Sequence, residues 1–553
     1  MKKMPAVVLA VSITAVLIAG TGAHADETGD LLLLRNTTLN LIEALVEQGV
    51  LAREQADQLI ANAEKKAREE VRRNERAAVK NERRVVRVPY VPEFVRDEIK
   101  QQVESEVRAK VVEDVMAQAK QERWGMPDAL PDWISRIKFK GDIRLRGQQD
   151  LFSSGNVEFS HIDFQKSNED GSLALLNTTE DRSRARIRLR IGMDAKVTTN
   201  LKTGIRLATG SFNDPVSTNQ TLGNYNSPDR LVLDRAYLQY KGHDADGYHW
   251  MTLTGGRMPN PWFSTDLIWD KDLNFDGFAA SFRHNLGGGG SLYDIDEQDS
   301  TLFATVGAFS LQEVELSSKD KWLFGAQLGF QKVFEDQSSF RIGLAYYNYD
   351  NIVGKRNSLD STLTDYTAPE FLQKGNSLFE ISNDTGGSLR RFGLASDYDI
   401  VDLTTRYDLA RFAPVHWVLT GSYVKNIGYD EDEIRKRTNG QMFVNSTLFT
   451  EDPSKDKTQG YTLKLAVGWP TTYERRSWQA FLSYRYLERD AVLDAFTDSD
   501  FFLGGTNSKG WIIGGSYGIN DYTWLKVRYL SADEIDGPPL GTDVLQFDVN
   551  ARF

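Results

Sequence analysis

The sequence contains no cysteine among its 553 residues. An exported enzyme could carry disulfides, whereas a transmembrane barrel is closed by backbone hydrogen bonds and needs none. Histidine is also scarce, and the 6 histidines are scattered without the spacing of metal ligands. The net charge of −12 gives no indication of a nucleic-acid partner. These scarcities argue against a histidine-based metal centre and a nucleic-acid-binding function.

Long hydrophobic runs are absent from most of the chain. Beyond residue 25, no stretch reaches the roughly 20 apolar residues that a membrane-spanning helix needs. The mean hydropathy is −0.44, which a soluble protein would also have. Transmembrane barrels have a similar average, because their strands alternate lipid-facing apolar and lumen-facing polar residues. The composition is therefore compatible with a barrel that crosses a membrane with strands.

The N-terminal residues have the pattern of an export signal. Lys2 and Lys3 precede an apolar run over 6–19, and a small-x-small cleavage pattern ends at Ala25. This order predicts a secretory signal peptide over 1–25. An uncleaved membrane anchor is the alternative, but the apolar run is short for a span. We therefore expect the mature protein to be exported.

Residues 26–130 have the apolar spacing of helices. The pattern breaks around Pro89 and Pro92, since proline disfavours helix before it and is tolerated at a helix start. The next helix carries a narrow apolar stripe flanked by charge: Phe94, Val95, Ile99, Val103, Val107, Val111, Val115 and Ala119. Such a stripe suits a coiled coil or another helix–helix association, and a helix lying against the barrel or in solvent is the alternative. We predict an α-helical periplasmic segment over 26–130.

From residue 137 onward the apolar period changes from 3.6 to 2, as in strands. The clearest case is the segment 182–197. One face carries the apolar residues Ala185, Ile187, Leu189, Ile191, Met193, Ala195 and Val197. The other face is mostly basic, with Arg182, Arg184, Arg186, Arg188 and Arg190. An alternation of this length is unusual in a globular strand and natural in a tilted membrane strand.

The same alternation marks sixteen candidate strands: 137–149, 182–198, 200–210, 231–241, 249–258, 276–286, 301–311, 321–334, 338–350, 389–410, 415–426, 459–468, 476–488, 508–519, 522–531 and 542–553. Their connections are alternately long, as at 351–388 and 427–458, and short, as at 335–337. This alternation is typical of outer-membrane barrels. We predict a mainly β protein in which 134–553 close into an antiparallel transmembrane β-barrel of about 16 strands, with fourteen or eighteen as alternatives.

The last candidate strand ends on an aromatic residue. Its apolar face consists of Leu545, Phe547, Val549, Ala551 and Phe553. A terminal phenylalanine after alternating apolar residues resembles the assembly signal of outer-membrane barrel proteins. The resemblance implies that the barrel-assembly machinery binds this strand and that Phe553 carries the signal.

Several further motifs resemble a family of Gram-negative outer-membrane proteins known as putative porins. They are Val-Pro-Tyr-Val-Pro-Glu-Phe-Val (88–95), Trp124, Pro127, Pro-Asp-Trp (131–133), Gly-Asp-Ile-Arg-Leu-Arg (141–146), Arg-Met-Pro-Asn-Pro (257–261) and Trp-Asp-Lys-Asp-Leu-Asn-Phe-Asp-Gly (269–277). The match covers almost the whole mature chain and departs at Ala52, where a helix-capping threonine is expected. The resemblance implies a location in the cell outer membrane, among its lipid and lipopolysaccharide, with periplasmic N-terminal helices. It also implies a homotrimer like the general porins.

The predicted channel lining is rich in arginine. A barrel of about 16 strands is too wide for side chains to fill, so it encloses water. An arginine on the lipid face would cost about 2–4 kcal/mol at mid-membrane, so we expect these residues to face the lumen. The predicted pore-lining residues are Arg144, Arg146, Arg184, Arg186, Arg188, Arg190 and Arg206.

The arginines have two interpretations. No comparable acidic ladder stands on another candidate strand, where Asp402 and Asp408 are the nearest candidates. A basic lining raises the local concentration of anions, which predicts a weakly anion-preferring pore. The alternative is that the arginines pair with acids of the barrel wall and only hold the strands together.

The third long connection, 259–276, is the predicted constriction loop. In the trimeric porins that the chain resembles, this loop folds inward and narrows the pore. Here it carries Asp266, Asp270 and Asp272, and its aromatic residues Trp262, Phe263 and Trp269 can wedge it against the wall. Acids on the loop that face a basic wall would set a transverse field across the channel. An ordinary solvated surface loop is the alternative.

The sequence patterns that resemble enzyme or metal motifs lack essential parts of those motifs. The run Gly-Gly-Ser-Tyr-Gly (514–518) matches a nucleophile elbow, but it lies inside a candidate strand and no histidine follows it. The acidic runs 294–299 and 430–433 lack the spaced, glycine-containing pattern of a calcium loop. We therefore predict no catalytic residue, no metal and no cofactor.

The leading hypothesis for the function is a porin, an aqueous channel for passive diffusion of small hydrophilic solutes and ions. The alternative is a structural barrel whose N-terminal helices attach it to the cell wall or to sister subunits. Active receptor-type transport is a third class. It calls for a larger barrel and an N-terminal plug, which the charged helices of 26–130 do not resemble.

Overall fold

The computed structural model describes residues 136–553, except 246, 287–299, 316 and 386–389. The predicted signal peptide, the helical segment 26–130 and the acidic run 294–299 lie outside the described residues. None of the helices among the described residues is long and apolar enough to cross a membrane.

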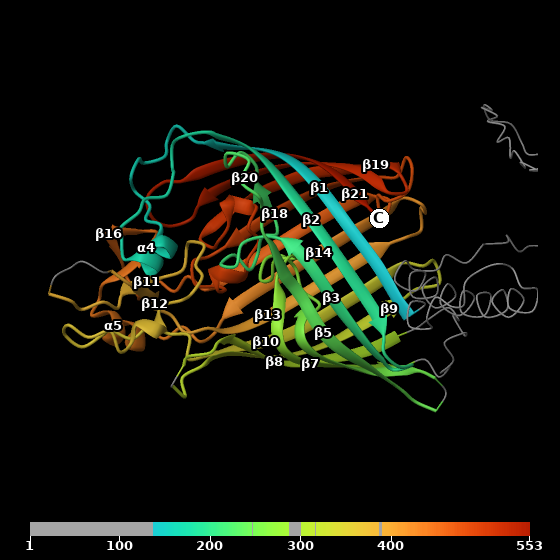
Figure 1. Cartoon of the computed structure of the whole chain (residues 1–553), viewed down its shortest axis with the longest axis horizontal. Helices are drawn as coiled ribbons and strands as arrows, with labels where there is room; N and C mark the ends of the chain where they lie inside the picture. The colour runs from blue at the N-terminus through green and yellow to red at the C-terminus, as the bar shows by residue number, and fades with distance from the viewer. Residues whose placement is uncertain (1–135, 246, 287–299, 316, 386–389) are drawn as a thin grey trace, which may run out of the picture. The chain divides into compact units, whose positions relative to one another are not determined.

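Sixteen strands form one closed antiparallel barrel, in which the last strand is hydrogen-bonded to the first (Figure 1). Their bounds are β1 (Ile137–Phe152), β2 (Arg182–Lys196), β3 (Leu201–Thr209), β5 (Leu231–His243), β6 (His249–Pro259), β7 (Asn274–Asn285), β8 (Ser300–Gln312), β9 (Lys321–Val333), β10 (Ser339–Asp350), β13 (Asp399–Leu409), β14 (His416–Asn426), β17 (Gln459–Gly468), β18 (Trp478–Leu487), β19 (Ser508–Asn520), β20 (Thr523–Glu534) and β21 (Gly541–Arg552). The predicted barrel and its strand number are confirmed.

One predicted strand is wrong in its extent. The candidate 389–410 contributes only β13 to the barrel. Its first part contains β12 (Phe392–Leu394), which belongs to a separate four-stranded sheet with β11 (Leu378–Glu380), β15 (Met442–Val444) and β16 (Ser446–Glu451). Phe392 and Leu394 are fully buried there. Apolar strand residues look alike in the sequence whether they meet lipid or the core of a small sheet.

The long connections gather at one end of the barrel and the short turns at the other (Figure 1). The long-loop end carries α4 (Phe164–Asp170), α5 (Glu431–Thr438) and the small sheet. The loops also contain β4 (Gln220–Thr221), which pairs with β2, and the single turns η2 (Asp365–Thr367), η3 (Asp494–Phe496) and η4 (Phe501–Leu503).

The acidic run 430–433 has a structural explanation. Asp430 is the N-cap of α5, and its side chain accepts a hydrogen bond of 3.0 Å from the backbone N–H of Glu433. The acids that follow occupy the first turn of the helix, where negative charge stabilises the positive end of the helix dipole.

Side chains alternate between the two faces of the barrel wall, as β21 shows. Leu545 and Phe547 are 46% and 48% exposed on the outer face. Gln546 and Asp548, which alternate with them, are 1% and 2% exposed on the inner face. A polar inner face and an apolar outer face suit a barrel that holds water inside and lipid outside.

The C-terminal residue closes the barrel against the first strand. The backbone N–H of Gly141 donates to the carbonyl of Phe553 at 2.8 Å, and the N–H of Phe553 donates back at 2.9 Å. Phe553 therefore completes the β1–β21 seam. Its role as an assembly signal stays a prediction.

Two glycines face each other on β6 and β7 near the base of the third loop. Gly256 pairs with Gly277 and has φ +111°, a conformation that favours glycine. A Cβ atom on Gly256 would lie 2.4 Å from the carbonyl oxygen of Ala236, which is backbone and cannot move aside.

We predict that Gly256→Ala destabilises the barrel by about 1–3 kcal/mol through backbone strain and this clash. The measurement is the fraction of heat-modifiable, folded protein on unboiled gels after heating in steps. Gly147→Ala is the matched control, because a Cβ atom there meets nothing within 4 Å. Equal melting of the two variants would contradict the prediction.

Candidate functional site

The third long loop, between β6 and β7, lies inside the barrel. Its Asp266 carboxylate is 2.6 Å from the Nη2 of Arg485 on β18, a strand across the ring from β7. A loop can reach that strand only through the lumen. The loop therefore crosses the lumen. That it narrows a pore stays a prediction.

Aromatic residues hold the base of this loop against the wall. The ring centroids of Trp262 and Tyr347 are 5.3 Å apart, and Trp269 packs edge-on against the same tyrosine at 5.2 Å. The backbone N–H of Phe263 donates to Oε1 of Gln327 on β9 at 2.8 Å. Both faces of the loop base are thus fixed, and little of its apolar surface meets the channel water.

The other two predicted acids of the loop have different partners. An oxygen of Asp272 is 3.3 Å from Nη1 of Arg190 on β2, and its second oxygen accepts a hydrogen bond of 3.1 Å from Thr218. Asp270 is 3% exposed and accepts a hydrogen bond of 3.1 Å from the backbone N–H of Ser499. The loop is therefore tied to β2 and β18, and to a second loop.

That second loop, 488–507 between β18 and β19, also enters the lumen, and sequence analysis missed it. Asp500 is 2.9 Å from Nη1 of Arg146 and is hydrogen-bonded to Arg528 on β20. Beside it, Phe501 and Phe502 are fully buried. A signal was present, because this loop repeats the combination of spaced aspartates and aromatic residues that marked the third loop.

The predicted arginine ladder is in place, but most of it is neutralised. Antiparallel pairing sets Arg144 opposite Arg188 and Arg146 opposite Arg186, as expected. The acid–arginine pairs are Arg146–Asp548 at 2.6 Å, Arg184–Asp150 at 2.6 Å, Arg188–Asp142 at 2.7 Å, Arg190–Asp142 at 2.8 Å and Arg206–Asp234.

These contacts agree with the alternative in which the arginines pair with acids of the barrel wall. The opposing aspartates are spread over β1, β5 and β21 and form no run in the sequence. Antiparallel register brings them to the arginines; Asp142, for example, faces Arg190 directly. The structural alternative for the ladder thus accounts for five of its seven arginines.

The remaining two arginines have no carboxylate partner within the described part of the chain. Arg144 donates to the side-chain oxygen of Asn219. Arg186 reaches only Gln148 and Ser217, both at 3.5 Å, the limit of a hydrogen bond. These two guanidinium groups keep an uncompensated positive charge toward the lumen.

The acids of the two inward loops have divergent pKa values. Burial opposes the charge of Asp500, but Arg146 and Arg528 outweigh it and hold its pKa well below the usual range. Burial and the neighbouring Asp498 raise the pKa of Asp270 well above that range. The arginines thus favour the charged form of Asp500, whereas burial and a neighbouring acid favour the neutral form of Asp270.

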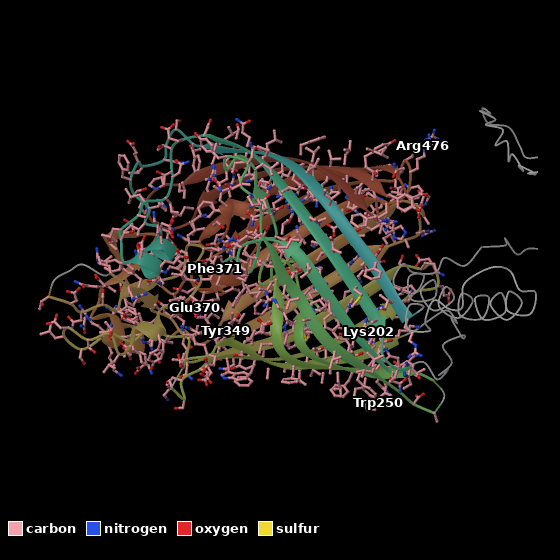
Figure 2. All side chains as sticks on the ribbon, in the orientation of Figure 1. Lys202, Trp250, Tyr349, Glu370, Phe371 and Arg476 are labelled. Carbon is pink, nitrogen blue, oxygen red and sulfur yellow. The ribbon has the colours of Figure 1, made fainter. Side chains whose placement is uncertain are left out.

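A cavity of about 540 Å³ opens among the loops at the long-loop end. Its lining includes Trp269 of the third loop, Phe496 of the second inward loop, and Glu370 and Phe371 of the connection 351–398. Figure 2 labels Glu370 and Phe371 at this end of the barrel. Among the described residues, no group of acids and histidines has the geometry of a metal site.

A family model described as putative porin matches residues 35–553. The chain belongs to the putative porin family. Together with the closed barrel, family membership identifies a porin-like channel protein of the outer membrane and points away from an enzyme. No curated protein has a significant match to this porin.

Solved structures with a similar fold include the outer-membrane channel DcaP of Acinetobacter baumannii, with 12% identity, a TM-score of 0.39, and 75% of this porin and 97% of that chain covered. OprB of Pseudomonas putida at high pH has 10% identity and a TM-score of 0.41, and the match covers 75% of this porin and 94% of that chain. OmpF of Salmonella typhi, in complex with daunomycin, has 11% identity and a TM-score of 0.36, and the match covers 75% of this porin and 97% of that chain.

We predict that Asp500→Asn destabilises this porin by about 3–5 kcal/mol, because it leaves Arg528 buried without its carboxylate partner and removes one of the two partners of Arg146. Heat-modifiability on gels measures the loss. Glu431→Gln is the control, since its ion pair with Arg435 lies on the exposed surface of α5. A melting temperature equal to that of the unmodified protein would show that Asp500 does not anchor the loop.

The stability of the second inward loop should depend on pH through Asp494. Asp494 is 1% exposed, and its carboxylate accepts a hydrogen bond of 3.1 Å from the backbone N–H of Gln373. Burial raises its pKa to about 7. Since the unfolded value is about 3.9, the neutral acid stabilises the folded loop below about pH 4, and this contribution is lost as pH rises to about 7.

The loop should therefore be cut faster by protease at about pH 8 than at about pH 5, after correction for the protease's own pH profile. In Asp494→Asn the side chain cannot ionise, so the difference between the two pH values should shrink. An unchanged difference in the variant would assign the pH dependence to another group.

Proposed function

We propose that this porin forms an aqueous channel for passive diffusion of small hydrophilic solutes and ions across the outer membrane. The observation that carries the proposal is the third loop, which crosses the lumen with Asp266 held by Arg485 on one wall and Asp272 held by Arg190 on another. A barrel of this strand number encloses a water-filled passage, and a fixed loop across it sets its width.

The proposed selectivity is a weak preference for anions. Asp266, Asp272 and Asp500 of the inward loops are bound to arginines, whereas Arg144 and Arg186 have no carboxylate partner among the described residues. The positive charge that remains at the narrow part of the channel raises the local concentration of anions. On this proposal the net charge of −12 belongs mainly to the exposed loops and turns.

The assembly proposals rest on the family resemblance. We expect a homotrimer, contact with lipopolysaccharide, and assembly through the strand that ends at Phe553. The apolar stripe from Ile99 to Val115 lies outside the described residues, so its part in trimer formation stays a prediction. Cross-linking in detergent tests the trimer, and a monomer in every condition would reject it. A trimer that survives removal of 26–130 would place the contact on the barrel.

We predict a reversal potential of anion-preferring sign when the purified protein is studied in planar bilayers under a KCl gradient. Replacing Arg144 and Arg186 by Gln should move it toward zero, because these two charges are not compensated. Arg435→Gln on α5, outside the lumen, is the control and should leave it unchanged. A clear cation preference, or the absence of any conductance, would overturn the proposal.

A further inference from the structure

Two lysines of the inner wall converge on one aromatic ring. The ammonium nitrogen of Lys464 on β17 lies 4.5 Å from the ring centroid of Phe481 on β18. The ammonium nitrogen of Lys526 on β20 lies 5.8 Å from the same centroid. The ring fixes both side chains in place, but a cation–π contact leaves their charge and hydrogen-bond donors available.

The acids near these lysines already have other partners. Asp266 of the third loop reaches β18, the neighbour of β17, but its carboxylate is bound to Arg485 at 2.6 Å. Asp548 lies directly opposite Lys526 in the β20–β21 pair, but Arg146 holds both of its oxygens, at 2.6 and 3.0 Å. Neither lysine forms an ion pair or a hydrogen bond with any residue that the structure describes. Their positive charges are therefore uncompensated.

The third loop adds a third lysine to this place. Lys271 stands between Asp270 and Asp272 and is exposed. It follows Asp266, whose carboxylate is 2.6 Å from Arg485 on β18, the strand that also carries Phe481. The described residues offer it no ion pair. The loop thus brings a further lysine to the side of the lumen where Lys464 and Lys526 converge on Phe481.

Three like charges held together repel one another unless an anion lies between them. The positive charge of Arg528 also repels Lys526, but Asp500 binds the guanidinium group of Arg528. A single chloride ion supplies only one negative charge to this group. A phosphate-type oxyanion supplies two or more charges and several acceptor oxygens, which match ammonium groups that act as point charges with rotatable donors.

We propose that Lys271, Lys464 and Lys526 form a binding site for multivalent oxyanions of the phosphate class at the constriction of this channel. The proposal rests on the proposed channel function, because the site serves transport only if solutes pass it. It differs from a generally basic lining, since most of the arginines are already neutralised. Binding concentrates such anions at the constriction while three flexible side chains still allow release.

The experiment measures binding of inorganic pyrophosphate to the purified full chain in detergent by calorimetry, at constant ionic strength set by KCl. We expect saturable binding that weakens about tenfold or more in the double variant Lys464→Gln, Lys526→Gln. Lys202→Gln is the matched control. Lys202 belongs to β3 and lies near the short-turn end of the barrel in Figure 2, so its loss should leave binding unchanged.

If the double variant fails to give heat-modifiable protein, Lys271→Gln on the loop replaces it, with weaker binding as the expected result. No saturable binding by the unmodified protein, or equal weakening in Lys202→Gln, overturns the proposal. KCl conductance in bilayers is recorded on the same samples. Conductance without pyrophosphate binding refutes the site alone, whereas binding without conductance keeps the site and refutes the channel function.

Discussion

Arginine side chains on the inner wall of this barrel need negative partners, and this requirement organises the lumen. Arg146 is 2% exposed and has two carboxylates, one from the wall at Asp548 and one from the inward loop at Asp500. Leaving such a group without a partner in a buried place costs several kcal/mol. The loops that carry these acids are therefore held inside the barrel by the arginines of the wall.

Apolar packing also holds the inward loops in place, in addition to the ion pairs. Trp262 and Trp269 of the third loop pack on Tyr347 of β10, and Trp269 also lies 5.9 Å from Phe496 of the second inward loop. These residues belong to one hydrophobic cluster that continues into the connection 351–398. The loops at the long-loop end thus share an apolar core with the barrel wall, and this core holds the third loop in place.

The strands were predictable because a barrel wall imposes one rule on every residue, with apolar side chains toward lipid and polar ones toward water. The candidate 389–410 failed because the same period also forms β12 in a small soluble sheet. The partners of the arginines could not be read from the sequence, since Asp548 lies 402 residues from Arg146 and only barrel closure joins them. The inward path of 488–507 depends on these distant pairs as well.

The charge of the lumen could be predicted only in part, because it depends on these distant ion pairs. The sequence placed a basic lining on β2, whereas the folded lumen leaves charge uncompensated at Arg144 and Arg186 and at lysines on other elements. The charge of the lumen depends on which cations lack a carboxylate partner. The sequence pattern alone does not show which residues pair across the barrel. The helical segment 26–130 and its part in assembly stay predictions.

The central claim is that the third loop crosses the lumen to β18, and the absence of cysteine allows a direct test. Thr265→Cys beside Asp266 and Ser483→Cys beside Arg485 keep the ion pair and place one thiol on the loop and one on the opposite wall. A bifunctional maleimide should cross-link this pair in folded protein and should not link Thr265→Cys to Lys202→Cys. A cross-link with Lys202→Cys, and none with Ser483→Cys, would contradict the account.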